Sequence, residues 1–288
     1  MDKKGLSSRD TKHTIRHRLK MDEAEVIYKM RGIKDADASM DWLDAMQDGR
    51  DQSHSLVRIE GRTAVFCDIH FGAHDIVALK TAIQAAKREK CINIVLNGDV
   101  VDSHRLSRHP QEPEAPRFTE ELAITRQFLK GLRVEFPDAR IIFKVGNHED
   151  RLQAYLIRNA DAVQELVNWP SLLHLATYGI EFVESGQFMK VGKTYIAHGH
   201  EFKVSGGINP ARTLLLKTYA DTVIGHVHRT SFSSGRSLDN KFIKCYSIGC
   251  LCKLVMNYMP HSNSNHGFAI IESDGAVRNF IIENGIVQ

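Results

Sequence analysis

A buried-strand pattern that ends in Gly98-Asp99 is the feature that most constrains the fold of this chain. The run 91–96, Cys-Ile-Asn-Ile-Val-Leu, is apolar and rich in β-branched residues, which predicts a strand buried on both faces. Such strands form parallel sheets whose two faces are covered. Ligands of open α/β sheets gather at the carboxyl ends of the strands. The sequence therefore predicts an α/β fold with a site near Asp99.

Four more apolar runs end in side chains of the same chemistry. The donors that follow them are Asp68 and His70 after 63–66, Asn147 after 141–145, His198 after 194–197, and His226 and His228 after 222–224. A lone Asp or Asn after a strand is more often a turn former, but the repetition at five strand ends argues against coincidence. Oxygen and nitrogen donors together suit a hard-to-borderline metal ion.

The five blocks resemble the motifs of the calcineurin-like metallophosphoesterases and follow that family's order. The blocks are Asp68-x-His70, Gly98-Asp99-x-x-Asp102, Gly146-Asn147-His148-Glu149, His198 and Gly225-His226-x-His228. They span residues 68–228, more than half of the 288 residues. The resemblance implies a four-layer αββα sandwich of two mixed sheets flanked by helices.

The resemblance also implies two divalent metal ions that share one carboxylate. One ion would take Asp68, His70, Asp99 and His228, and the other would take Asp99, Asn147, His198 and His226. Manganese is the expected activator, with magnesium, zinc, iron, nickel or cobalt as alternatives. Two ions about 3.5–4 Å apart suit phosphoryl chemistry, because they bind the attacking oxygen and neutralise phosphate charge together. We therefore expect a phosphoesterase that attacks with a metal-bound hydroxide.

Two residues are expected to act beside the metals. His148 matches the family position that protonates the leaving group or holds the phosphate, a role that fits an imidazole near pH 7. Asp102 resembles a residue that contacts the metal ligands without binding metal itself. His148 and Asp102 are together the predicted catalytic residues. Glu149 departs from the commoner Asp and is a candidate to orient His148. His200 either lines the site or is a bystander, since His198 follows its strand directly.

Substrate specificity is expected to come from the loops around the motifs. The candidate substrate-binding residues are Asn147, His104, Arg105, Arg108, His109, Arg151 and His200. Cationic side chains among them suit phosphate through charge-assisted hydrogen bonds. The competing interpretation is that Arg108 and Arg151 are surface residues that form ion pairs with Glu112 or Asp150.

Three functions stay open at the level of the sequence. The overall sequence pattern resembles that of compact bacterial and bacteriophage members of the family, and the first 20 residues are basic. Both features favour a phosphodiesterase that acts on DNA or RNA. A phosphomonoesterase or small-nucleotide phosphodiesterase is the alternative of the same fold. A nucleic-acid-binding or regulatory scaffold with a vestigial metal site is the alternative of another class. The net charge of +3 is too small to decide between them.

Composition gives the expected domain organisation and compartment. Residues 1–54 are basic, then acidic, and are predicted to form a mostly helical arm or small module, whereas 55–288 form the metallophosphoesterase domain. The chain shows neither a signal-peptide pattern nor an apolar run of membrane-spanning length, so we expect no membrane partner. Its 5 cysteines predict reduced thiols and a cytoplasmic protein, with Cys250-x-Cys252 packing in the core.

Periodicity predicts an alternation of strands and helices, followed by a run of short strands. The first half is predicted to hold strands at 63–67, 91–97 and 140–145 and helices at 75–90, 118–135, 149–159 and 161–175. The second half is predicted to hold one helix at 209–219 and strands at 181–183, 188–191, 194–197, 221–224, 229–233, 241–248, 267–273 and 277–282.

Overall fold

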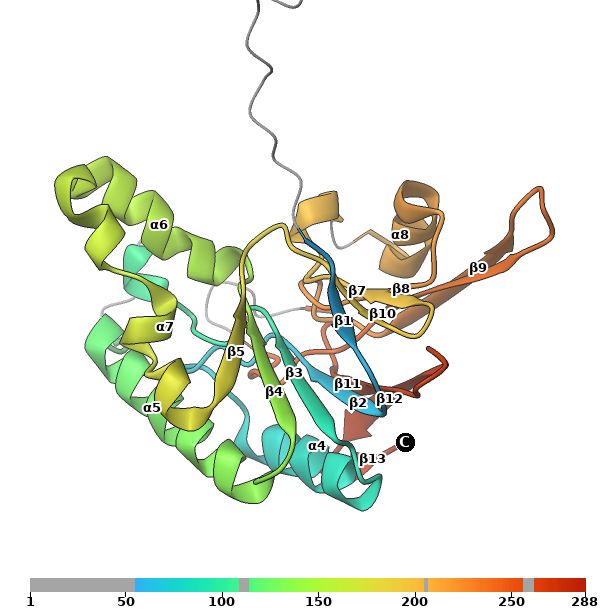
Figure 1. Ribbon diagram of the computed structural model, residues 1–288, viewed down its shortest axis with the longest axis horizontal. Helices are drawn as coiled ribbons and strands as arrows, with labels where there is room; N and C mark the ends of the chain where they lie inside the picture. The colour runs from blue at the N-terminus through green and yellow to red at the C-terminus, as the bar shows by residue number, and fades with distance from the viewer. Residues whose placement is uncertain (1–54, 109–113, 205–206, 256–261) are drawn as a thin grey trace, which may run out of the picture. The chain divides into compact units, whose positions relative to one another are not determined.

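A computed structural model describes residues 55–108, 114–204, 207–255 and 262–288 of the chain. The predicted arm 1–54 and the candidate residue His109 lie outside these ranges. The described part contains two mixed β-sheets that face each other, with helices on their outer sides (Figure 1). The predicted α/β class and two-sheet architecture are confirmed. No helix in these ranges is long and apolar enough to cross a membrane.

The seven-stranded sheet carries the first half of the predicted elements. Its strand order is β13-β12-β11-β2-β3-β4-β5, and β2 to β5 run parallel. The strands are β2 (Thr63–Phe66), β3 (Asn93–Asn97), β4 (Arg140–Lys144), β5 (Ile180–Val183), β11 (His266–Ile271), β12 (Val277–Glu283) and β13 (Ile286–Val287). Every residue of β2 and β3 is buried, as the continuous apolar runs predict.

Four helices belong to this sheet. They are α4 (Ile76–Arg88), α5 (Phe118–Glu135), α6 (Asn147–Asn159) and α7 (Trp169–Leu172). Asp75 caps α4 as predicted, because its carboxylate accepts the backbone N–H of Ala78. The single helix predicted at 161–175 is wrong. This stretch forms a 3-10 turn at Asp161–Leu166, then α7, then another turn at Leu175–Tyr178, because Pro170 cannot donate a helical hydrogen bond.

The six-stranded sheet carries most of the second half. Its order is β1-β6-β7-β8-β10-β9, with strands β1 (Val57–Ile59), β6 (Met189–Val191), β7 (Thr194–Ile196), β8 (Thr222–Ile224), β9 (Ser231–Arg236) and β10 (Phe242–Ser247). The helix α8 (Pro210–Thr218) packs on β9 and β10 and starts at Pro210. Two strands were not predicted, β1 and β13, and both are very short.

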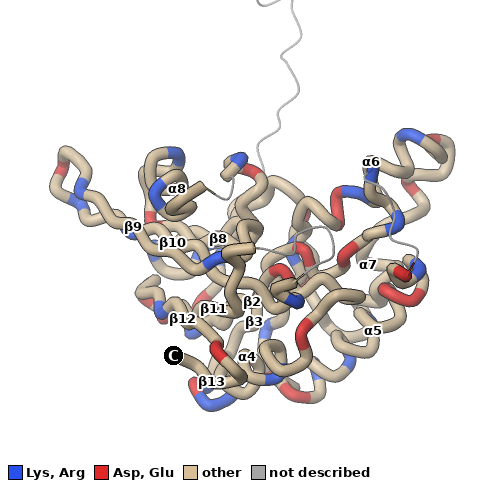
Figure 2. The backbone as a smooth tube through the Cα atoms, turned by 180° about the vertical axis from the view of Figure 1, so that it is seen from behind, with Lys and Arg blue, Asp and Glu red and all other residues tan. Residues whose placement is uncertain are grey.

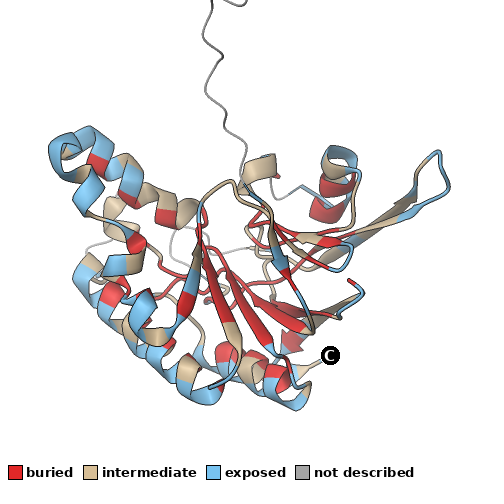
Figure 3. Ribbon diagram, in the orientation of Figure 1, coloured by how far each residue is buried: buried red, intermediate tan, exposed pale blue. Residues whose placement is uncertain are grey.

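Three clusters of buried apolar residues lie between these layers. Figure 3 shows the buried positions gathered in the strands and on one side of the helices. The largest lies between the seven-stranded sheet and α4, α5, α6 and α7. A second lies between the two sheets and includes Val65, Val95 and Val223. The third joins α8 to the six-stranded sheet through residues such as Leu214 and Cys245. The result is a four-layer arrangement in which one outer layer is much thinner than the other.

Candidate metal centre

The segments that follow β2, β3 and β8 bring four predicted ligands together, here called the first set: Asp68, His70, Asp99 and His228. The Nε2 of His228 lies 3.3 Å from Asp68 Oδ1 and 3.2 Å from His70 Nε2. His70 Nε2 is 3.9 Å from Asp99 Oδ2. Donor atoms about 2.1 Å from one ion lie about 3.0–3.4 Å apart in octahedral or tetrahedral geometry, so the first set has the spacing of a metal site.

The segments after β4 and β7 complete a second set: Asp99, Asn147, His198 and His226. His198 Nε2 lies 3.2 Å from Asp99 Oδ2 and 3.1 Å from Asn147 Oδ1. A ring nitrogen of His226 comes within 4.8 Å of the donor atoms of Asp99 and His198. Asp99 therefore stands between both sets, as the shared carboxylate was predicted to do.

The backbone is strained where it presents these ligands. Five donors adopt left-handed conformations that side chains rarely occupy: Asp68 (φ 54°), His70 (φ 50°), Asp99 (φ 52°), His226 (φ 67°) and His228 (φ 55°). Each such residue costs of order 1–3 kcal/mol, and such strain gathers at functional sites. Packing is also close, since a Cβ on Gly98 would lie 2.5 Å from His198 Nδ1. The glycine in the Gly-Asp block is therefore required by space as well as by its own φ of 83°.

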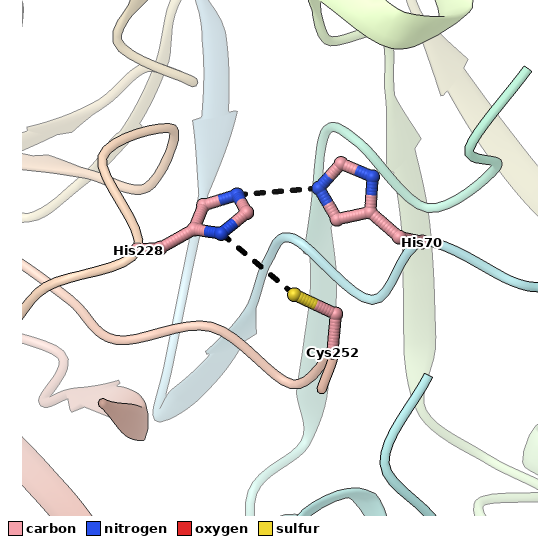
Figure 4. Close-up of side chains that lie close together, drawn as sticks. All are labelled: His70, His228 and Cys252. Carbon is pink, nitrogen blue, oxygen red and sulfur yellow. Dashed lines mark hydrogen bonds between the residues drawn. The ribbon is translucent and has the colours of Figure 1, made fainter. Parts of the chain in front are cut away.

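Three of the histidines are oriented in the same way: Nδ1 contacts a protein group and Nε2 faces the site. His198 Nδ1 lies 2.7 Å from the backbone oxygen of Asn97, and His70 Nδ1 lies 3.0 Å from Asp102 Oδ1. His228 Nδ1 lies 3.7 Å from Cys252 Sγ (Figure 4). Partners of this kind fix the tautomer and the ring plane of metal-binding histidines.

Cys252 lies close enough to His70 and His228 to suggest a third cluster. Figure 4 shows His228 in contact with both of the others, with Nδ1 toward Cys252 and Nε2 toward His70. The short contacts use opposite nitrogens of the His228 ring, and Nε2 is the nitrogen that faces Asp68 and His70, so we assign Cys252 to the support of His228. Cys250 and Cys252 are both buried free thiols, as the core-packing prediction has them, and the Cys252 thiol in addition contacts His228 Nδ1.

The charges at the centre favour a bound cation. Burial opposes ionisation of Asp68 and Asp99, yet the histidines around them hold the pKa of both carboxyls below the ordinary value. Burial likewise opposes a charged His198 ring, but Asp99 raises its pKa to about 10, so positive charge is stabilised there. Burial and His198 lower the pKa of His226 to about 4, which leaves a neutral ring able to bind metal.

His226 adds the clearest observation of fit. Its Nδ1 is buried and has no hydrogen-bond partner among the described residues, while its backbone N–H donates to the Asp68 carboxylate at 2.9 Å. A buried nitrogen without a partner is costly unless something else binds it. The donor types, their spacing and this free nitrogen all fit divalent metal ions.

The predicted pair His148 and Asp102 lies at the rim of the first set. His148 Nδ1 lies 2.9 Å from Asp102 Oδ1 and 2.8 Å from the Asp102 backbone oxygen, while its Nε2 lies 3.8 Å from Asp99 Oδ2. Arg151, one turn later on α6, places Nη2 2.8 Å from His148 Nε2 and Nη1 2.9 Å from the Asp102 backbone oxygen. Arg151 therefore belongs to the site and is no surface partner of Asp150.

Two buried glutamates hold the loop that carries Asp99 and Asp102. Glu149 accepts the N–H groups of Gly146 and Asp99 on one oxygen, and those of Val100 and Val101 on the other, all at 2.8–2.9 Å. The suggestion that Glu149 orients His148 is therefore replaced by a role in fixing the Asp99 turn. Glu121 of α5 accepts the N–H groups of Ser103 at 2.7 Å and His104 at 3.3 Å.

A buried ion pair supports the second set. Lys144, fully buried at the end of β4, lies 3.0 Å from Glu201. The Glu201 carboxylate accepts the N–H of Gly199 at 2.7 Å and that of His198 at 3.3 Å. Burial opposes its ionisation, but Lys144 lowers the pKa of Glu201 to about 2. The pair thereby joins the segment that bears Asn147 to the one that bears His198.

The other candidate substrate residues occupy varied positions. His200 lies beside the second set, with its ring 5.3 Å from that of His198, and its Nε2 lies 3.3 Å from Asp150 Oδ2. His104 Nδ1 is 3.9 Å from Asp102 Oδ2. Arg105 donates to the backbone oxygen of Ala115 at 2.6 Å, and Arg108 is exposed. Among these four, His200 and His104 contact groups of the centre.

Sequence reasoning missed four residues that support the site: Glu121, Lys144, Glu201 and Cys252. One of them carried a signal. Lys144 interrupts the apolar run 141–145 just before Gly146, where a buried ammonium requires a carboxylate partner. The other three have no local pattern that separates them from ordinary helix, loop or core residues.

An α/β sandwich with histidine and carboxylate donors at one end of its strands defines a candidate metal-dependent hydrolase. The sequence model of the calcineurin-like phosphoesterase family matches residues 61–254, more than half of the chain. This chain belongs to the calcineurin-like phosphoesterase family.

Comparison with solved structures gives fold-level likenesses. Yfce, a phosphoesterase from E. coli, is 16% identical, with 78% of this chain and 96% of that chain covered and a TM-score of 0.39. The cold-active protein-tyrosine phosphatase of a psychrophile, Shewanella sp., is 12% identical, with 79% and 82% covered and a TM-score of 0.33. Comparison with curated proteins gives no match.

Proposed function

We propose that this chain is a two-metal phosphodiesterase with DNA or RNA as its substrate and manganese as its activator. The observation that carries the metal dependence is the joint presence of all seven predicted donors in two sets that share Asp99. A scaffold with a vestigial site has no reason to keep five strained ligand positions. The sets would hold divalent ions, which supply a nucleophile at neutral pH and neutralise charge on the phosphate.

The chain's own residues position a proton at the rim of this centre. A guanidinium only donates, so His148 Nε2 accepts from Arg151 in this arrangement, and the ring proton is on Nδ1, facing Asp102. Asp102 then orients His148 with Nε2 toward Asp99 and the place of the phosphate. We propose that Arg151 turns to a phosphate oxygen when substrate binds. His148 Nε2 is then free to take up a proton from solvent water and give it to the leaving oxygen.

Arg151→Gln tests that step. A donor that stabilises charge in the transition state is worth about a hundredfold or more, so kcat/KM for a diester is expected to fall by about that factor. Arg158→Gln, an exposed change two turns along the same helix, is the matched control and is expected to have little effect. Equal activity of Arg151→Gln and wild type would remove Arg151 from the mechanism.

The proposed function is tested by hydrolysis assays on chelator-treated protein with manganese added back. The panel holds bis-p-nitrophenyl phosphate, p-nitrophenyl phosphate, and labelled single- and double-stranded DNA and RNA. Metal-dependent cleavage of the diester and of a nucleic acid is the expected result. Cleavage of the monoester alone would replace the proposal with a phosphomonoesterase. Metal binding without turnover of any member would favour the scaffold.

A further inference from the structure

The β9–β10 hairpin has two unlike faces. Ile243 and Cys245 of β10 pack toward α8, in the cluster that also contains Leu214 and Leu215. Because side chains alternate along a strand, their neighbours point to the other side. That side, here called the aromatic face, is formed by Phe232, Ser234 and Arg236 of β9 and Phe242, Lys244 and Tyr246 of β10.

The register places these residues in three facing pairs. Phe232 is opposite Tyr246, with ring centroids 5.0 Å apart, Ser234 is opposite Lys244, and Arg236 is opposite Phe242. Tyr246 reaches the apolar core between the two sheets, but Phe232 and Phe242 are each 50% exposed. Figure 1 shows the hairpin projecting beyond the body of the fold. Two large rings are thus held rigidly on a sheet and left open to solvent.

The charge on this face has one sign. Its six residues include two cations and no carboxylate. Within the described ranges neither Arg236 nor Lys244 makes an ion pair, and the Lys244 ammonium lies 5.8 Å from the Phe242 ring centre. Asp239, at the turn, pairs with Lys241 instead. Figure 2 shows basic positions on the β9–β10 hairpin, with an acidic position toward its tip. The face therefore complements an anion that also carries flat apolar groups.

The base of the hairpin is joined to the segment that carries His228. Phe232 follows the first-set residue His228 by four positions, and Ser247 at the end of β10 donates to the backbone oxygen of Arg229 at 2.6 Å. From Tyr246 to Phe242 the strand extends about 13 Å away from that end, at about 3.3 Å per residue. A chain molecule bound along the exposed part of the face would therefore run toward the segment that carries His228.

We propose that the aromatic face binds a single-stranded segment of the nucleic-acid substrate, with bases stacked on Phe232 and Phe242 and phosphates near Lys244 and Arg236. Aromatic rings combined with cations are how proteins bind single strands without reading sequence. In a duplex the faces of the bases are stacked inside the helix, so they are not available to stack on the two phenylalanine rings. This inference rests on the proposed function and narrows its substrate to single strands.

The test measures affinity and cleavage separately. Binding of a labelled single-stranded oligonucleotide is measured with chelator present, which prevents cleavage. Phe232→Ala and Phe242→Ala are each expected to weaken binding by about fivefold to a hundredfold. Lys244→Ala is expected to weaken it less and to reduce its salt dependence. Tyr219→Ala, which removes an aromatic ring that is 72% exposed outside this face, is expected to bind as wild type.

The outcomes separate this inference from the proposed function. Wild-type affinity in both phenylalanine variants, with folding verified by thermal unfolding, would overturn the role of the hairpin. Wild-type protein that hydrolyses bis-p-nitrophenyl phosphate but prefers duplex to single strands would also overturn it while leaving the diesterase intact. Absence of any diester hydrolysis would instead refute the proposed function. A dimer that Phe232→Ala and Phe242→Ala dissociate would assign the face to contact between copies.

Discussion

The two ligand sets share Asp99 but differ in charge. The first set adds a second buried carboxylate, Asp68, to two imidazoles, whereas the second adds the neutral amide of Asn147 to two imidazoles. A unit charge about 4 Å away is worth about 4 kcal/mol at an effective dielectric constant of about 20, so one carboxylate matters greatly to a divalent ion. The first set should therefore hold its ion more tightly than the second.

The sets also differ in what lies behind them. In the first set, His70 and His228 contact an ionised carboxyl, Asp102, and a thiol, Cys252. In the second set, His198 contacts a backbone oxygen, and the free Nδ1 belongs to His226. The comparison suggests a division of labour. We therefore expect the first set to retain its ion and the second to lose its ion more easily.

The largest expected effect comes from the residue that both sets share. Asp99→Asn replaces the bridging carboxylate by an amide and should weaken metal binding in both sets. We expect kcat/KM for bis-p-nitrophenyl phosphate to fall by at least about a thousandfold, which corresponds to about 4 kcal/mol of transition-state stabilisation. Asp138→Asn, an exposed change at the surface, is the control. Retained activity in a folded Asp99→Asn protein would refute the shared-carboxylate arrangement.

The difference between the sets is tested directly by calorimetric titration of chelator-treated protein with manganese. Two binding steps are expected. Asp68→Asn should weaken the tighter step by about a hundredfold or more, because a buried unit charge is lost. Asn147→Ala should weaken the other step and leave the tighter one in place. Asn159→Ala at the end of α6 serves as control. If Asn147→Ala instead abolished the tighter step, the ranking of the two sets would be reversed.

A smaller effect is expected behind His228. Cys252→Ala removes the group that faces His228 Nδ1, and loss of such a partner typically costs 10-fold to 100-fold in metal affinity. Cys252→Ser should recover part of the loss, since a hydroxyl also accepts the ring N–H. Cys91→Ala, a buried thiol outside both sets, provides the matched control. Unchanged affinity of the tighter step in Cys252→Ala would show that the thiol only fills space.

The contrast between ligands and supporting residues explains how far the sequence could lead. Ligands lie at the ends of apolar runs, so the positions of Asp68, Asp99 and His198 followed from local pattern and chain order. The structure brings these residues together as the pattern predicts. Supporting contacts depend on pairs that are distant in sequence. The partner of His228 is 24 positions away in Cys252, and Glu201 is 57 positions from Lys144, separations that no local period encodes.

The fold shows the same limit. Long periodic segments such as α5, predicted at 118–135 and found there, are determined by their own pattern. The helix predicted at 161–175 failed because its apolar spacing was read through Pro170, which cannot lie inside a longer helix and instead occupies the first turn of α7. Strands β1 and β13 have only three and two residues, and their pairing with β6 and β12 comes from tertiary context.

The last expected effect is on stability and not on metal binding or activity, and it concerns Glu121, which lies behind Asp102 and hence behind the first set. Burial and the Asp102 charge raise the pKa of Glu121 from 4.5 to about 8, although two backbone N–H groups favour its ionised form. Because the folded pKa is raised, the stabilisation is full below about pH 4.5 and is lost as pH rises toward about 8. The Glu121→Gln side chain cannot ionise, so its free energy of unfolding should depend less on pH between about 4.5 and 8. The measurement is urea unfolding of chelator-treated protein across that range. Glu283→Gln, at an exposed position, is the control and should follow wild type. A Glu121→Gln curve parallel to wild type would mean that Glu121 titrates normally, and that the support behind Asp102 is purely one of backbone hydrogen bonds.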